Sequence, residues 1–271
     1  MANVNPIKLI ACDVDGTLIA PDGTIPDRNR EAIAAASARG VHFVLASARP
    51  PRMARPIYDE LALSSYQINY NGAVIQRPSD AEYAVHRPIE PALARRLVAV
   101  ARRIDPQLAV SLEVKDQWFT DGQIDGLTTA TSLNLKPDYE GPLDAVMNQP
   151  ITKVLLLIPP ERMSHLHRGL RAFFRHHLRF QISDAHLIQA VQPQADKHHG
   201  VQWIANHDGV SPENVLTLGD APNDAGMLRW AHTSVAVANA WPEAQDAAKH
   251  IANVTAEQGA VGWAIEKFVL S

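Results

Sequence analysis

The sequence predicts an α/β protein in which a parallel sheet is interrupted by an inserted α+β segment. Two observations predict the parallel sheet: apolar runs alternate with helical segments up to about residue 75, and this alternation returns after residue 193. A third observation predicts the insertion, because the intervening stretch changes to strands that can pair as neighbours. We therefore expect a core domain of residues 1–84 and 192–271 and a second domain of residues 85–191.

Apolar runs and helix-boundary residues predict the first half of the core. Residues 7–12 form an apolar run that is typical of a buried strand. Pro26 near the start and Gly40 just past the end delimit a helix over residues 27–39. We next expect a strand at 41–46, a helix at 52–61, a strand at 67–69 and a turn at 71–72. Strands separated by helices imply right-handed crossovers and parallel pairing.

The insertion and the second half of the core follow the same reasoning. In the insertion we expect a helix at 91–104 and a strand at 108–114, followed by Trp118 and Phe119 and then by a polar, loop-prone stretch to Pro150. A strand at 153–158, a helix at 161–177 and a hairpin of 179–182 with 186–191 follow. In the core we then expect helices at 197–206 and 224–230, each followed by a strand, at 214–218 and 233–238. A C-terminal helix is expected at 261–270.

Composition and charge argue against several classes of function. The 271 residues have a formal net charge of −4, which gives no long-range attraction for nucleic acid or anionic lipid. No apolar run approaches the roughly 18 residues of a membrane span, and the first residues lack the pattern of a secretory signal. Cys12 is the single cysteine, so no intrachain disulfide can form, and burial in an apolar strand makes its thiol inert. We expect a cytoplasmic protein.

The most informative stretch is Asp13-Val14-Asp15-Gly16-Thr17-Leu18, which follows the first predicted strand. Alternation along a strand points residues i and i+2 to the same side, so the two carboxylates can converge. Two like charges held close raise the pKa of one of them unless a cation intervenes. This arrangement suits one ionised nucleophile, one protonatable acid/base and a bound metal ion. An Asp-rich turn is the structural alternative, and the partners downstream decide between the two.

Three further polar clusters fall at or near strand ends: Ser47, Lys197, and Asp220 with Asn223 and Asp224. Ligands of open α/β sheets bind beyond the carboxyl ends of the strands. Taken singly, each cluster has an ordinary explanation as a turn residue, a surface lysine or a helix cap. Because all of these clusters occur in this order and at strand ends, we interpret them together as a ligand site.

The predicted cluster holds oxygen ligands, a hydroxyl group and a cation. Mg²⁺ prefers hard oxygen ligands and usually keeps several waters. Asp13, Asp220 and the backbone carbonyl of Asp15 could supply the ligands, and Asp224 could hold a coordinated water. Ser47 and Lys197 would hold a phosphate, aided by backbone N–H groups of the turn at 15–17.

These motifs resemble those of the haloacid dehalogenase superfamily, and specifically its Cof-type hydrolases with an α+β cap of the C2B type. The family's D-x-D-G-T-L motif matches residues 13–18, and its strand ending in Ser or Thr matches Ser47. The D-K-x-x-G motif is similar to residues 196–200, and G-D-x-x-N-D is similar to residues 219–224. The Asn71-Gly72-Ala73 turn and the Asn239-Ala240 pair also match the pattern of this family. The resemblance spans nearly the whole chain.

The resemblance implies a Rossmann-like three-layer core with an inserted cap, and a Mg²⁺-dependent phosphomonoester hydrolase acting on small phosphorylated metabolites such as sugar phosphates. It implies that Asp13 is the nucleophile, forming an aspartyl-phosphate, and that Asp15 is the general acid/base. The implied phosphate-binding residues are Ser47, Ala48, Lys197 and Asn223. The implied metal-binding residues are Asp13, Asp15, Asp220 and Asp224. We expect a monomer or a weak homodimer.

Specificity is expected to come from the insertion, since the core motifs bind only phosphate and metal. Candidates are Glu113, Trp118, Asp121 and the loop at 134–140. Two alternatives to a phosphatase stay open: a phosphomutase of the phosphomannomutase type, and a non-catalytic phospholigand-binding module. Ala48 and Ala238 stand where the family usually has glycine, which matters only if a positive φ is required there.

Overall fold

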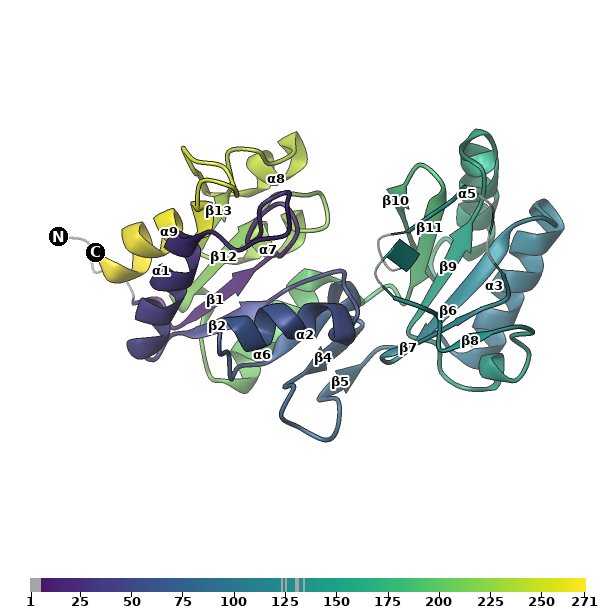
Figure 1. The fold of residues 1–271 in the computed structure, drawn as a ribbon, viewed down its shortest axis with the longest axis horizontal. Helices are drawn as coiled ribbons and strands as arrows, with labels where there is room; N and C mark the ends of the chain where they lie inside the picture. The colour runs from purple at the N-terminus through teal and green to yellow at the C-terminus, as the bar shows by residue number, and fades with distance from the viewer. Residues whose placement is uncertain (1–5, 123, 125, 130–131, 134) are drawn as a thin grey trace. The chain divides into compact units, whose positions relative to one another are not determined.

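The chain forms two compact units, each with its own sheet (Figure 1). The structure is a computed structural model that describes residues 6–122, 124, 126–129, 132–133 and 135–271. The core unit consists of Met1–Val85 and Asp196–Ser271, and the inserted unit of His86–Ala195. None of the described helices is long and apolar enough to cross a membrane.

A five-stranded parallel sheet with the order β14-β13-β12-β1-β2 forms the centre of the core unit. Its strands are β1 (Leu9–Cys12), β2 (His42–Leu45), β12 (Val215–Gly219), β13 (Thr233–Ala236) and β14 (His250–Ile251). All four residues of β1 are buried, as the apolar run predicted. Because β1 lies between β2 and β12, the carboxyl ends of these three strands meet at one edge of the sheet.

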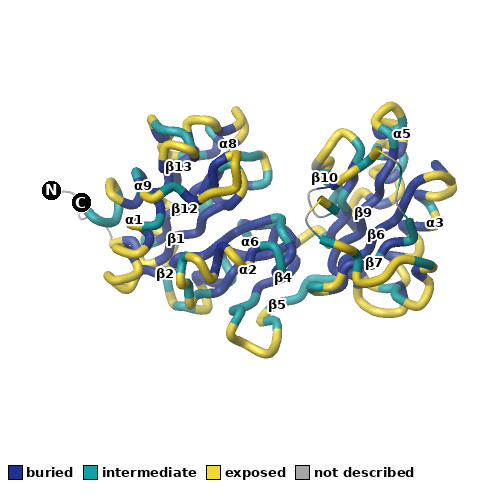
Figure 2. The backbone as a smooth tube through the Cα atoms, in the orientation of Figure 1, coloured by how far each residue is buried: buried dark blue, intermediate teal, exposed yellow. Residues whose placement is uncertain are grey.

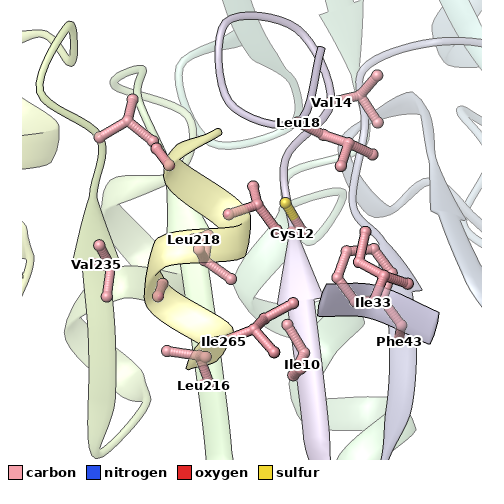
Figure 3. Close-up of a cluster of buried hydrophobic side chains, with 14 of the residues drawn as sticks. Ile10, Cys12, Val14, Leu18, Ile33, Phe43, Leu216, Leu218, Val235 and Ile265 are labelled. Carbon is pink, nitrogen blue, oxygen red and sulfur yellow. The ribbon is translucent and has the colours of Figure 1, made fainter. Parts of the chain in front are cut away.

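Helices cover both faces of this sheet and make a three-layer α/β fold. They are α1 (Asp27–Ala38), α2 (Pro51–Glu60), α6 (Lys197–His207), α7 (Ala225–Trp230), α8 (Pro242–Ala247) and α9 (Ala260–Ile265), with π-helical turns at Glu266–Leu270. Alternation along β1 separates the layers: Ile10 and Cys12 pack among side chains of α1 and α9, whereas Leu9 and Ala11 pack with α6 and α7. Figure 3 shows the first of these clusters, with the Cys12 sulfur among apolar side chains.

A small three-stranded sheet extends the core unit. It consists of β3 (Gln67–Asn69), β4 (Val74–Gln76) and β5 (Val85–His86), with a 3₁₀ turn at Tyr70–Gly72. The strand at 67–69 and the turn were predicted, but β4 and β5 were not, because strands of three and two residues carry little periodicity. Gly72 has a φ of +98°, and a Cβ there would lie 2.4 Å from the carbonyl oxygen of Asp196. Only glycine therefore allows this turn to approach the start of α6.

The inserted unit is α+β, with a sheet of order β10-β11-β9-β6-β7-β8. Its strands are β6 (Ala109–Val114), β7 (Gln117–Thr120), β8 (Tyr139–Glu140), β9 (Lys153–Leu157), β10 (Arg179–Asp184) and β11 (Leu187–Val191). The predicted hairpin is the antiparallel pair of β10 and β11. Trp118 and Phe119 lie in β7, and the stretch that follows them to Pro150, which was expected to be loop-prone, also contains β8 and a 3₁₀ turn at Val146–Asn148.

Helices α3 (Pro91–Ile104) and α5 (Pro160–Phe174) pack on one face of the inserted sheet (Figure 1). A stripe of buried residues at helical spacing explains α3: Ala94, Leu97, Val98 and Ala101. Helix α5 was expected to reach residue 177 but ends at Phe174, the last residue of its buried stripe. The next three residues offer no apolar side chain to bury. Buried strands form the interior of each unit (Figure 2).

Candidate active site

Asp13 follows the last residue of β1 at the carboxyl edge of the core sheet. Its backbone N–H donates to the carbonyl of Leu218 at 2.9 Å, which fixes the end of β1 against β12. The chain then turns at Gly16, whose φ is +80°. A Cβ at this position would lie 2.6 Å from Asp220 Oδ2. Glycine therefore permits both the turn and the close approach of the two acidic motifs.

Lys197 joins the first and last motifs in a buried ion cluster. Its Nζ donates to Asp13 Oδ1, and to Asp224 Oδ1 at 2.6 Å, and only 1% of the lysine is exposed. Lys197 is the first residue of α6, directly after the N-cap Asp196, whose carboxylate accepts from the N–H of His198. The helix start thus positions the ammonium group between two carboxylates.

The environment raises the pKa values of three groups in this cluster, Asp13, Asp220 and Lys197. Burial raises the pKa of Asp13 well above its usual value, and the charge of Asp224 adds to this while Lys197 opposes it. Burial and Asp224 likewise raise the pKa of Asp220. For Lys197, burial alone would lower the pKa, but the charges of Asp13 and Asp224 outweigh it and raise the pKa. The site therefore holds more negative than positive charge and favours an additional cation.

Asp13, Asp220 and Asp224 together fit a divalent cation. Each offers a carboxylate oxygen, and these oxygens lie within 4.8 Å of one another. Asp220 is oriented by Thr17, whose hydroxyl donates to Oδ1 at 2.9 Å. Carboxylate oxygens are the donors that Mg²⁺ prefers. Both oxygens of Asp224 already accept hydrogen bonds. Oδ1 accepts from Lys197, and Oδ2 accepts from the backbone N–H groups of Asp220 and Ala221 at 3.0 Å.

Asp15 stands apart from the acidic cluster formed by the described residues. Its side chain is 56% exposed and forms a bidentate ion pair with Arg49. Arg49 Nε donates to Oδ2 at 2.9 Å and Nη2 donates to Oδ1 at 2.6 Å. The sequence analysis did not predict this pairing.

Ser47 and Ala48 lie just beyond β2, where the sequence predicted them. Ser47 is fully buried, and its hydroxyl oxygen accepts the N–H of Arg49 at 3.1 Å. Neither Ala48 nor Ala238 has a positive φ, so the absence of glycine imposes no backbone strain at either position. Asn223 is half-buried, and its Nδ2 donates to Asn71 Oδ1 at 3.0 Å. The turn after β3 thus supports the last motif.

Two contacts that the sequence reasoning missed stabilise the first motif. Thr17 binds Asp220, as described above, and Asn239 Nδ2 donates to the carbonyl of Gly16 at 2.9 Å. The resemblance had included residues 239–240 without a role for them. The signal available in the sequence was the position of Asn239, whose side-chain amide follows a core strand and can bind the turn at Gly16.

The specificity candidates of the inserted unit have different environments. Glu113 and Trp118 are buried and occupy opposite positions in the β6–β7 pair. Asp121 instead forms an ion pair with Arg102, and its Oδ1 accepts the N–H of Val110 at 2.8 Å. In the loop at 134–140, residue 134 lies outside the described residues, and Tyr139 and Glu140 form the exposed strand β8.

The chain belongs to the haloacid dehalogenase-like hydrolases, whose family model matches residues 10–265. It is 28% identical to "Putative phosphatase YxeH" of Bacillus subtilis strain 168, over 97% of this chain and 99% of that protein. It is also 28% identical to the "5-amino-6-(5-phospho-D-ribitylamino)uracil phosphatase YitU" of the same organism, over 91% of each.

The fold is similar to that of solved members of this family. One is the crystal structure of a haloacid dehalogenase-like hydrolase from Bacteroides thetaiotaomicron, with a TM-score of 0.81 and 24% identity. The match covers 96% of this chain and 99% of that one. The α/β fold with its parallel sheet and the family membership predicted from the motifs are therefore confirmed.

Proposed function

We propose that the protein is a Mg²⁺-dependent phosphatase that hydrolyses small phosphorylated metabolites, with sugar phosphates as the substrate class. The observation that carries this proposal is the buried cluster in which Lys197 binds both Asp13 and Asp224. The names of the relatives support it, because one of them acts on a phosphorylated ribityl chain. We also expect the reaction to occur in the cytoplasm, in a monomer or weak homodimer.

Asp13 is the proposed nucleophile. Its carboxylate oxygen attacks phosphorus, the bond from phosphorus to the ester oxygen breaks, and an aspartyl-phosphate forms. Water then attacks this phosphorus, which releases inorganic phosphate and restores the carboxylate. Lys197 supports this role, because its ammonium group keeps one oxygen of Asp13 oriented and reduces repulsion toward an anionic ester.

Asp15 is the proposed general acid/base. It gives a proton to the departing alkoxide and later takes one from the attacking water. Both of its oxygens accept hydrogen bonds from Arg49 in this structure, so proton transfer requires at least one of these bonds to open. Arg49 is accordingly a positioning residue for this carboxylate.

Asp13 and Asp220 are the proposed direct ligands of Mg²⁺, together with the backbone carbonyl of Asp15. A bound Mg²⁺ would neutralise charge between the carboxylate nucleophile and the phosphate. The double engagement of Asp224, by Lys197 and by two backbone N–H groups, favours a role in holding a coordinated water over direct ligation. We propose Ser47, the Ala48 backbone, Lys197 and Asn223 as the phosphate-binding groups.

Substitution of the nucleophile tests the proposal. Asp13→Asn should abolish Mg²⁺-dependent hydrolysis of p-nitrophenyl phosphate while the circular dichroism spectrum stays unchanged. Asp22→Asn, in a turn outside the site, is the matched control and should retain activity. Turnover that persists in the Asp13 variant, or wild-type protein without any phosphate release, would contradict the assignment.

A further inference from the structure

The inserted unit carries a cavity, lined by both polar and apolar side chains, on the sheet face that α3 and α5 leave uncovered. Along β6, Val110, Leu112 and Val114 pack into the cluster formed with these helices. Successive side chains of a strand point to opposite faces, so Ser111 and Glu113 lie on the other face. Both are buried although both are polar. Polar side chains buried in a cavity are a common feature of ligand sites.

The cavity has a volume of about 90 Å³. Its floor is formed by Ser111 and Glu113 of β6, Trp118 and Thr120 of β7, and Leu155 and Leu157 of β9. An apolar cavity of about 150 Å³ can hold benzene, so this one has room for on the order of four heavy atoms. It can therefore enclose one end of a small molecule.

The carboxylate of Glu113 and the hydroxyl of Ser111 are acceptors on this floor. An ionised Glu113 carboxylate can only accept hydrogen bonds. The Ser111 hydroxyl donates to Thr120 Oγ1 at 2.9 Å, so its hydrogen is used and its oxygen is left to accept. The Thr120 hydroxyl lies 2.8 Å from the carbonyl of Gly122, to which it donates. A ligand that enters can therefore donate hydrogen bonds to Glu113 and Ser111.

The charge of the site favours hydroxyl donors over an ammonium group. In the antiparallel register, Lys153 of β9 lies opposite Glu113 and on the same face, and it is also buried. Its positive charge offsets that of Glu113, so a cation would gain little. On β7, the strand on the other side of β6, Trp118 lies opposite Glu113, and its aromatic ring can pack against the C–H groups of a ligand.

We propose that this Glu113 cavity binds the hydroxylated end of a neutral polyol chain. Adjacent hydroxyl groups donate to Glu113 and Ser111, and the carbon chain lies against Trp118. The inference rests on the proposed function and deepens it, because a polyol chain is the non-phosphate part of a sugar or sugar-alcohol phosphate.

Matched substrates test the inference in the full chain. D-ribitol 5-phosphate and n-pentyl phosphate have the same number of carbons but differ in hydroxyl groups. Wild-type protein should prefer the ribitol ester by at least about tenfold in kcat/KM, since a hydrogen bond to a charged group contributes about that factor. Glu113→Gln should remove most of this preference by raising KM for the ribitol ester. The rate on p-nitrophenyl phosphate, which has no polyol chain, is measured for each variant as the reference.

Two further variants keep the test decisive. Asp105→Asn alters another buried carboxylate of the inserted unit, one paired with Arg162 outside the cavity, and should keep the wild-type preference. If Glu113→Gln does not fold, as judged by circular dichroism, Ser111→Ala removes an acceptor at small change of volume and should reduce the preference in the same way. Equal kcat/KM for the two esters in wild-type protein would overturn the inference.

A binding measurement separates this inference from the proposed function. Saturation-transfer NMR with free ribitol needs no catalysis, and the signal should be present with wild-type protein and reduced with Glu113→Gln. Hydrolysis of p-nitrophenyl phosphate without any ribitol signal would refute the cavity's role and leave the phosphatase intact. A ribitol signal in a protein that releases no phosphate would refute the phosphatase and support the cavity as a polyol site.

Discussion

Replacing Lys197 with methionine would leave two buried carboxylates without their shared ammonium group. Lys197 is 1% exposed, and both Asp13 and Asp224 are buried. Removing one partner of a buried ion pair typically costs about 3–5 kcal/mol, because the remaining charge is uncompensated in a poorly solvated place. Methionine keeps most of the side-chain length, so lost packing contributes little. We expect the free energy of unfolding to fall by about 3–5 kcal/mol.

Urea denaturation at pH 7 without divalent cations measures this loss. Lys249→Met, at an exposed lysine of the same unit, is the control and should change the free energy of unfolding by less than about 0.5 kcal/mol. Adding Asp224→Asn to Lys197→Met should recover part of the loss, because it removes one of the two uncompensated charges. An unfolding midpoint for Lys197→Met equal to that of wild-type protein would refute the argument from charge burial.

Three further outcomes are expected. Gly16→Ala should destroy phosphatase activity, because the φ of +80° disfavours alanine and the new Cβ would lie 2.6 Å from a carboxylate oxygen of the site. Gly23→Ala, with a φ of +85° and no atom within 4 Å, should retain it in the same assay. Arg49→Gln should lower kcat on p-nitrophenyl phosphate several-fold while changing the free energy of unfolding by less than about 1 kcal/mol, because the ion pair is partly exposed. An unchanged kcat would mean that Arg49 does not position its carboxylate partner. The raised pKa of Asp13 makes its ionised form unfavourable in the folded state, so its contribution to stability becomes less favourable as pH rises from the ordinary Asp value toward the raised one. In metal-free protein, Asp13→Asn should therefore be more stable than wild type at pH 7, by a margin that shrinks toward pH 4 in urea titrations. A margin that grows on acidification would contradict this sign.

Much of the fold could be predicted because its long elements carry strong local signals. The buried stripe of α3 and the apolar run of β1 have clear periods of helix and strand. Strands such as β4, β5 and β14 have two or three residues, and they exist only because neighbouring strands offer hydrogen-bond partners. Their positions depend on tertiary structure, which local patterns do not contain.

The candidate site could be predicted as a set of residues but not as a network of contacts. Motif spacing placed Asp13, Lys197 and Asp224 at converging strand and helix ends. It did not reveal that Asp224 uses one oxygen for Lys197 and the other for two backbone N–H groups. Nor did it reveal the bidentate pair of Asp15 with Arg49. Such details depend on side-chain rotamers and on segments that are distant in sequence.

The burial of Cys12 gives the chain a surface without native thiols. Because the chain has one cysteine and apolar side chains enclose it, burial raises its thiol pKa, and maleimide reagents should leave it unmodified in the folded state. A single engineered cysteine on either unit would then be labelled selectively with a dye or a spin label. The response of that label to an added ligand could be followed spectroscopically without first removing a native cysteine.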